Sequence, residues 1–140
     1  MVAVHLRPVM NRDDEFYWEG TREQKLLLQE CAGCGRVRHP PTPTCPWCRS
    51  LEVSLRPSVG RGEVFSFIVP RYPEFPGFGA GYVVALVELE EGVRMIANVR
   101  GVEPSEVAVG MPVRLIWEQM EDGYWLPQFE PALPGAAPAP

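Results

Sequence analysis

Apolar and polar residues alternate over several short stretches in the second half of the chain, which is the pattern of β-strands. Within residues 64–69, the alternation predicts that Phe65, Phe67 and Val69 share one strand face. Residues 82–87 are nearly all apolar, as in a strand covered on both faces. The expected strands lie at residues 64–69, 82–87, 93–99, 113–117 and 124–126. Five such strands with one turn-like insert over residues 103–110 predict a small, partly open barrel of the OB type.

The first half has a helical pattern followed by a turn-rich one. Residues 11–22 predict a helix, with Asn11 or Asp13 as its cap. The consecutive rings of Phe16, Tyr17 and Trp18 cannot all lie on one helix face, so part of their surface needs a cover. Either the metal-binding module of this chain supplies that cover, or the rings are contacts for another protein or a substrate.

The four cysteines form two Cys-x-x-Cys pairs, Cys31/Cys34 and Cys45/Cys48, separated by ten residues. Two such turns can present four thiolates to one metal ion, so we expect a structural Zn²⁺ in a closed sulfur shell. Iron in a rubredoxin-like site stays open as an alternative. A thioredoxin-type redox pair is disfavoured because its βαβ setting is absent. His39 is expected to end a strand rather than act as a further ligand.

Charge is distributed unevenly between the two halves. Residues 1–60 hold eight Lys/Arg against seven Asp/Glu, whereas residues 61–130 hold five Arg against eleven acidic residues. An acidic barrel repels phosphates, so nucleic acid is not expected as a partner. No stretch approaches the ~20 apolar residues that cross a membrane, and residues 1–10 lack the apolar run of a signal peptide. We therefore expect a cytoplasmic protein without a membrane partner.

The sequence offers no residue constellation for catalysis. Its two histidines, His5 and His39, have no evident Ser or Cys partner, and phosphate-binding glycine loops are absent. The most unusual stretch is residues 70–81, which combine three aromatic, three Pro and three Gly residues. Its aromatic residues are candidate partner or substrate contacts, although a cover over the barrel core explains them equally well. These aromatic residues are Tyr72, Phe75 and Phe78.

Several motifs in chain order resemble a known family, the zinc-ribbon and OB-fold acyl-CoA-associated proteins, formerly a domain of unknown function. The N-terminal motifs are Phe16-Tyr17-Trp18-Glu19-Gly20, Leu28-Gln29-Glu30-Cys31, Cys34-Gly35, Pro40-Pro41 and Cys45-Pro46-x-Cys48. The later motifs are Gly60-Arg61-Gly62-Glu63-Val64-Phe65-Ser66, Val84-Ala85-Leu86-Val87-Glu88-Leu89, Gly92-Val93-Arg94, Gly110-Met111-x-Val113 and Pro127-x-Phe129. The resemblance covers most of the chain, from about Asp13 to Phe129.

The resemblance implies a mainly β fold, and the whole chain is expected to have four parts. Three of these are an N-terminal helical segment at 1–24, a rubredoxin-like zinc ribbon at 25–56 and a five-stranded OB-fold barrel at 57–130. The fourth, a disordered Pro/Ala tail at 131–140, is expected from its composition alone. The resemblance also implies a role, because such proteins accompany thiolase-superfamily enzymes. Some hold a thiolase and a hydroxymethylglutaryl-CoA synthase together, and others serve steroid side-chain breakdown with a hydratase subunit or a thiolase-like aldolase.

The expected function is therefore that of a non-catalytic subunit in a hetero-oligomer with a thiolase-superfamily partner. The partner would be a lipid-transfer-protein-like aldolase or an acetyltransferase, and an acyl-CoA ligand would bind in the complex. Two alternatives remain. One is a module for single-stranded nucleic acid, whose available stacking residues are Phe65, Phe67, Phe75, Phe78 and Trp117. The other is a free-standing acyl-CoA-binding protein, whose anionic ligand requires a rim of cations. The candidate cations are Arg61, Arg71, Arg94 and Arg100.

Overall fold

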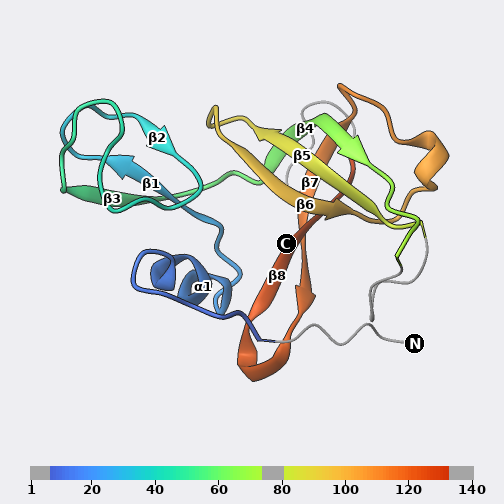
Figure 1. Cartoon of the computed structure of the whole chain (residues 1–140), viewed down its shortest axis with the longest axis horizontal. Coiled ribbons are helices and arrows are strands. Elements are labelled where there is room, and N and C mark those ends of the chain that lie inside the picture. Colours follow the sequence, from blue (N-terminus) through green and yellow to red (C-terminus); the bar gives the residue numbers. More distant parts are fainter. Residues whose placement is uncertain (1–6, 74–80, 133–140) are drawn as a thin grey trace.

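The computed structural model describes residues 7–73 and 81–132 of the 140-residue chain (Figure 1). They form a short helix, a three-stranded ribbon and a closed five-stranded barrel, which confirms the predicted mainly β fold. The N-terminal elements are α1 (Glu15–Thr21), β1 (Leu27–Cys31), β2 (Val37–Arg38) and β3 (Val53–Pro57). The barrel elements are β4 (Arg61–Ile68), β5 (Val83–Leu89), β6 (Arg94–Val99), η1 (Pro104–Glu106), β7 (Pro112–Gln119), η2 (Glu121–Gly123) and β8 (Trp125–Pro131).

Helix α1 is shorter than the predicted helix over residues 11–22, and its N-cap is Asp14. The side chain of Asn11 explains the late start, because its Oδ1 accepts hydrogen bonds from the backbone N–H groups of Asp13 and Asp14. Such local bonds favour a turn over a helix. The prediction that Asn11 or Asp13 caps the helix was therefore wrong. Asp14 itself makes no side-chain capping bond.

The ribbon has the strand order β2-β1-β3, with both neighbours antiparallel to β1. Strand β3 was not predicted. It pairs along its whole length with β1, from Val53 opposite Cys31 to Pro57 opposite Leu27. All five of its residues are exposed, so it is an edge strand that lacks the buried face on which strand prediction depends.

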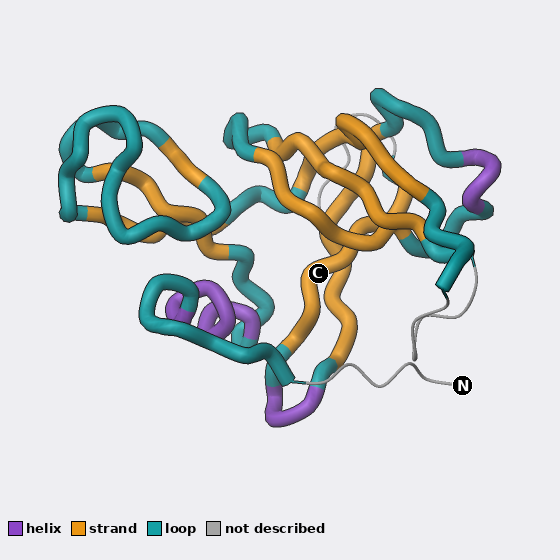
Figure 2. Tube along the Cα trace, in the orientation of Figure 1, coloured by secondary structure: helices purple, strands orange, loops and turns teal. Residues whose placement is uncertain are grey.

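The barrel has the strand order β4-β5-β6-β8-β7 and closes through the pairing of β7 with β4 (Figure 2). It is closed, whereas the alternation pattern suggested a partly open barrel. Its interior is filled by side chains that point inward from each strand, which include Val64, Val87, Val113 and Phe129, all at most 1% exposed. The predicted alternation in residues 93–99 is confirmed, because Met95, Ala97 and Val99 are buried.

Two strand-face predictions were wrong. Phe67 and Val69 both pack against the core, but Phe65 does not share their face, because a β-bulge between Val64 and Ser66 shifts the register with β5. Phe65 lies at this bulge and is 43% exposed, while Phe67 pairs with the buried Ala85. Strand β5 is not covered on both faces either. Its residues alternate between buried and half-buried, so one face lines the barrel core and the other is on the outside of the barrel.

The helix and the ribbon share one hydrophobic core with the barrel. Tyr17 from α1 and Leu26 and Leu28 around the start of β1 belong to the same buried cluster as the barrel side chains. A second link joins α1 to the β7–β8 connection, where the Tyr124 hydroxyl donates a 3.0 Å hydrogen bond to Oε1 of Glu19. The ribbon, helix and barrel are therefore held by apolar packing and by polar contacts at the surface. The domain limits proposed from the sequence stay predictions.

Within residues 7–73 and 81–132, no helix is long and apolar enough to cross a bilayer.

Candidate metal centre

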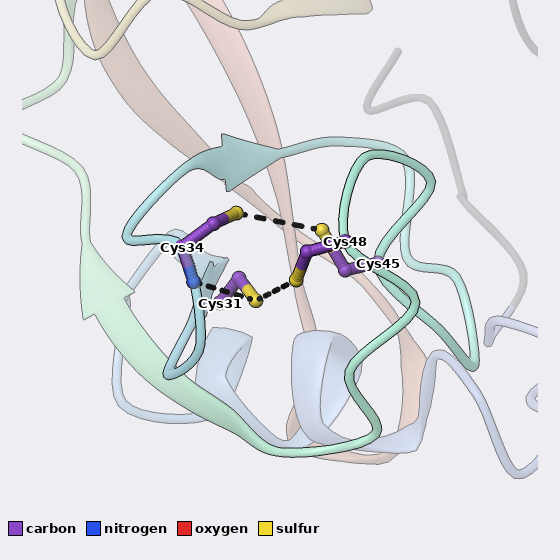
Figure 3. A group of neighbouring side chains, drawn as sticks. All are labelled: Cys31, Cys34, Cys45 and Cys48. Carbon is purple, nitrogen blue, oxygen red and sulfur yellow. Dashed lines mark hydrogen bonds between the residues drawn. The ribbon is translucent and has the colours of Figure 1, made fainter.

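The four cysteines lie together in the ribbon, where their side chains point toward one another (Figure 3). Cys31 ends β1, Cys34 follows in the next turn, and Cys45 and Cys48 lie in the connection between β2 and β3. Their sulfur atoms are all within 4.8 Å of one another. The sulfur atoms of Cys31 and Cys48 are 3.4 Å apart, and those of Cys34 and Cys45 are 3.7 Å apart.

The two Cys-x-x-Cys segments fold in the same way. In the first, Gly35 donates its N–H to the Cys31 carbonyl at 2.9 Å; in the second, Arg49 donates to the Cys45 carbonyl at 2.9 Å. Gly35 and Arg49 both have a positive φ, of 77° and 63°. This left-handed residue turns the chain back after each pair and directs the two thiols of the pair to one point. The two turns are thus equivalent halves of one site.

The geometry fits a four-coordinate metal. A tetrahedral ion with bonds of ~2.3 Å to sulfur requires sulfur–sulfur separations of about 3.8 Å, close to those observed. The donor set consists of four thiols, which suits a closed structural centre and leaves no position for a substrate. Cys31 and Cys45 are buried while Cys34 and Cys48 are exposed, so the centre lies at the surface of the ribbon.

Electrostatics also favour a cation at this point. The backbone N–H of Cys34 donates to Cys31 Sγ at 3.4 Å, which is the main reason that the pKa of the Cys31 thiol is lowered to about 6. The backbone at Ser50 acts in the same direction on Cys48, but the neighbouring Cys31 thiol and burial outweigh it and raise the pKa of Cys48 to about 11. Four thiols this close cannot all ionise unless a cation compensates their charge.

His39 is placed apart from the sulfur cluster, as the sequence predicted. It follows β2 and packs against Tyr17, with ring centroids 5.6 Å apart. Burial lowers the pKa of His39, so its neutral form is favoured in the folded protein. The described residues contain a single group of three or more His, Cys, Asp or Glu side chains that are close enough to hold a metal, and that group is the cysteine cluster.

The aromatic contact candidates are not gathered at one site. Tyr17 is buried in the shared core, and Phe16 and Trp18 pack against it while half-buried, so this chain itself covers most of their ring surface. Tyr72 is almost fully exposed. Phe75 and Phe78 lie outside the described residues. A contact role for Phe16, Trp18 or Tyr72 stays a prediction.

Of the proposed rim of cations, three are already paired with carboxylates. Arg61 pairs with Glu90, Arg94 with Glu88 and Arg100 with Glu118, at 3.1, 2.9 and 2.7 Å. Arg61 and Arg94 start the two strands that flank β5, whereas Arg100 follows the opposite end of β6, which does not favour a rim made of all three together.

A buried polar cluster inside the ribbon was missed in the sequence. The Arg38 side chain is 4% exposed, and its Nε donates to Oε1 of Gln29 at 3.0 Å. The same Gln29 oxygen accepts the backbone N–H of Thr42 at 2.9 Å. Gln29 and Arg38 lie opposite each other on β1 and β2. A correct alignment of these two strands in the sequence would have predicted their contact.

The comparisons with known proteins agree with this architecture. Residues 18–54 match the family model described as "ChsH2, rubredoxin-like zinc ribbon domain", and residues 55–118 match "ChsH2, C-terminal OB-fold domain". The chain is also 32% identical, over 108 residues, to a DUF35 domain-containing scaffold protein of Pyrococcus furiosus, and it covers 79% of that relative. The chain belongs to the ChsH2/DUF35 family. The resemblance noted in the sequence is thereby confirmed.

Two longer members of the family align over most of this chain. It is 43% identical over 132 residues to a "Probable enoyl-CoA hydratase alpha subunit" of Thermomonospora curvata, covering 94% of this chain and 41% of that protein. It is 44% identical over 117 residues to the "3-oxo-4,17-pregnadiene-20-carboxyl-CoA hydratase alpha subunit" of Mycobacterium tuberculosis, covering 84% and 37% respectively. The chain thus spans about two fifths of the length of these curated relatives.

Solved structures in the family share the fold. A chain of the "Ltp2-ChsH2(DUF35) aldolase" superposes with a TM-score of 0.86 at 43% identity, covering 91% of this chain and 100% of that one. A DUF35 protein from Sulfolobus solfataricus, of unknown function, superposes with a TM-score of 0.63 at 16% identity. The second likeness concerns the fold alone.

Proposed function

We propose that this chain is a non-catalytic accessory subunit of a thiolase-superfamily acyl-CoA enzyme, and specifically of a retro-aldolase in steroid side-chain degradation. The observation that carries the proposal is the match to the aldolase chain, which this chain covers completely at 43% identity. The names of the two longer relatives are those of hydratase subunits, and one specifies a pregnadiene-carboxyl-CoA, so they support the class of CoA thioester rather than the cleavage itself. The chain then acts within a hetero-oligomer, and the acyl-CoA ligand binds in the complex.

The cysteine cluster has a structural role in this proposal. A zinc ion bound by Cys31, Cys34, Cys45 and Cys48 would fix the two turns of the ribbon and hold β1 to β3. The ion would supply no chemistry to the acyl-CoA substrate, because four sulfur ligands complete its coordination. The family description as a rubredoxin-like zinc ribbon supports zinc over iron.

An apolar surface on the barrel is the proposed contact for the partner enzyme. It lies on the outward face of β4, β5 and β6, where Ile68 pairs with Val84 and Leu86 pairs with Ile96. Ile68 and Ile96 are 63% and 72% exposed, and Phe65 at the bulge lies beside them on β4. Clustered exposed side chains of this kind mark protein interaction sites more often than single ones do.

Co-expression with a lipid-transfer-protein-like thiolase homologue tests the proposal. We expect a stable complex on size-exclusion chromatography with light scattering, and cleavage of a steroid side-chain acyl-CoA thioester by the complex. The Ile96→Glu variant should weaken the complex at least tenfold, since it places a charge in an apolar interface. Val109→Glu is the matched control, because Val109 is 68% exposed but lies in the loop between η1 and β7.

The outcomes separate the alternatives. Turnover of acyl-CoA substrates by the purified chain alone, at ordinary enzymatic rates, would show that it is not an accessory subunit. Salt-dependent binding of single-stranded DNA or RNA at low micromolar concentration would favour the nucleic-acid module instead. Tight acyl-CoA binding by the chain, together with no complex on co-expression, would favour the free-standing carrier.

A further inference from the structure

Residues of the ribbon and of the turn between β5 and β6 together line a cleft of about 450 Å³. Figure 1 shows the ribbon beside this turn. The walls of the cleft come from both modules: Arg38, His39, Pro46 and Trp47 from the ribbon, and Gly92 and Arg94 from the barrel. The volume is within the ~300–1,000 Å³ range of sites for small organic ligands. The cleft shares Pro46 and Trp47 with the second cysteine turn, and Arg94 also lies over Phe65 of the apolar barrel surface. Neither the metal centre nor that surface assigns a ligand to the cleft.

The charge of the cleft is opposite to that of the chain. The chain has a net charge of −5, yet the charged side chains in the wall are Arg38 and Arg94, and no described Asp or Glu lines it. Arg36 adds a third guanidinium nearby, 5.1 Å from the centroid of the Trp47 ring. A local concentration of guanidinium groups attracts anions and binds phosphate or carboxylate with well-defined geometry.

Arg38 provides an independent indication that the cleft suits an anion. It is buried, and its acceptors are neutral: Gln29 Oε1 at 3.0 Å and the Thr42 carbonyl at 3.4 Å. Within the described part of the chain its Nη1 has no hydrogen-bond partner. Buried charges are normally paired, because an unpaired one carries a large desolvation cost. An anion in the adjacent cleft would compensate this charge.

The remaining wall residues suit a flat ring. The Trp47 side chain is 52% exposed, so part of its ring is open to a ligand in the cleft that it lines. Pro46 and His39 add two further ring surfaces to the same wall. A half-exposed indole next to guanidinium groups is the arrangement that stacks on a heterocycle while cations hold its phosphates.

We propose that this cleft binds a phosphorylated heterocycle, a nucleotide whose ring stacks on Trp47 and whose phosphates lie between Arg38 and Arg94. Arg94 already pairs with Glu88 at 2.9 Å and lies 3.6 Å above the Phe65 ring. Its side chain is still 48% exposed, so it can also contact a phosphate. Free adenine nucleotides and the nucleotide end of CoA share this chemistry. The inference does not depend on the proposed function, since neither ligand requires a partner enzyme to test.

The test uses the full, metal-loaded chain and two readouts, isothermal titration calorimetry and the indole N–H resonance of Trp47, assigned from a Trp47→Phe variant. ADP should bind and shift that resonance, whereas adenosine and inorganic phosphate alone should bind at least tenfold more weakly. Arg94→Gln should weaken ADP binding about tenfold, the effect of losing one charged hydrogen bond. Arg100→Gln is the matched control, because Arg100 is also 48% exposed and also pairs with one carboxylate, that of Glu118.

The source of the ligand follows from a parallel titration with CoA. Binding of CoA at least as tight as that of ADP identifies CoA as the ligand, while binding of ADP without CoA identifies a free nucleotide. Both outcomes support the cleft. The proposal is overturned if neither compound binds at millimolar concentration, if binding leaves the Trp47 resonance unmoved, or if Arg94→Gln and Arg100→Gln lower the affinity equally.

Discussion

Gly62 gives the sharpest prediction for the barrel, because the chain leaves no room for a side chain there. It lies near the start of β4, paired with Leu89 of β5 on one side and with Val113 of β7 on the other. A Cβ atom at this position would lie 2.3 Å from the backbone oxygen of Glu88 and 3.0 Å from its carbonyl carbon. Replacing Gly62 with alanine therefore forces a clash with backbone, which cannot rotate away as a side chain can.

The size of the effect follows from that distance. Real Cβ contacts are essentially never shorter than 3.0 Å, so the Glu88 oxygen must move until it is at least that far from the added Cβ. Because β4 is paired on both sides in a closed barrel, this movement stretches the hydrogen bonds of either β5 or β7. Overpacking costs about 1–3 kcal/mol and a weakened ladder bond about 1 kcal/mol more, so we expect Gly62→Ala to cost roughly 2–4 kcal/mol.

Equilibrium urea denaturation at pH 7.5, followed by fluorescence and circular dichroism on metal-loaded protein, measures this loss. Gly101→Ala is the control, because Gly101 has a positive φ of 72° and no atom lies within 4 Å of the place that an added Cβ would take. It should cost about 1 kcal/mol from backbone strain alone. A Gly62→Ala variant within about 0.5 kcal/mol of the parent, or no less stable than Gly101→Ala, would refute the close approach of β4 and β5.

Three further predictions concern the metal centre, the buried histidine and the helix anchor. By elemental analysis we expect about one zinc per chain in the parent and none in the Cys45→Ser variant. The variant should also lose hydrogen-exchange protection in the ribbon. If it keeps both the zinc and the protection, a four-sulfur structural site is contradicted. Burial lowers the pKa of His39 in the folded protein below its value of about 6.5 in the unfolded chain. Neutral His39 therefore contributes its full stabilisation above about pH 6.5, and this contribution is lost as pH falls through the folded pKa. His39→Phe should therefore flatten the fall in unfolding free energy between pH 7.5 and 5.5, and an unchanged slope would exclude His39 as its cause. Tyr124→Phe removes the hydrogen bond to Glu19 and should cost about 1 kcal/mol with faster exchange in α1, whereas a neutral result would mean that this contact does not hold the helix.

Local patterns in the sequence were sufficient for the metal centre and for part of the barrel. The spacing of Cys31, Cys34, Cys45 and Cys48 fixes two short turns, and each turn closes within five residues of chain. The alternation in β6 is equally local, because one face of that strand meets the core throughout. These features depend on neighbours in the sequence, which is the reason that they could be predicted.

The errors arose where distant segments decide the structure. The exposure of Phe65 depends on a bulge that appears only when β4 is aligned with β5. Strand β3 has no buried face, and its existence depends on pairing with β1. The cluster of Arg38 with Gln29 likewise requires the β1–β2 register, and the cleft beside it requires the barrel turn at Gly92. None of these contacts leaves a trace in the spacing of residue types along the chain.

The most direct test of the accessory-subunit account is recovery of the tagged chain from its native cells, with the co-purifying proteins identified and quantified by mass spectrometry and the sample assayed for acyl-CoA cleavage. The account predicts a thiolase-superfamily protein in stoichiometric amount, and cleavage activity that disappears when the two proteins are separated and returns when they are recombined. Recovery of the chain with nucleic acid or a polymerase component, or with full activity in the separated chain, would contradict it.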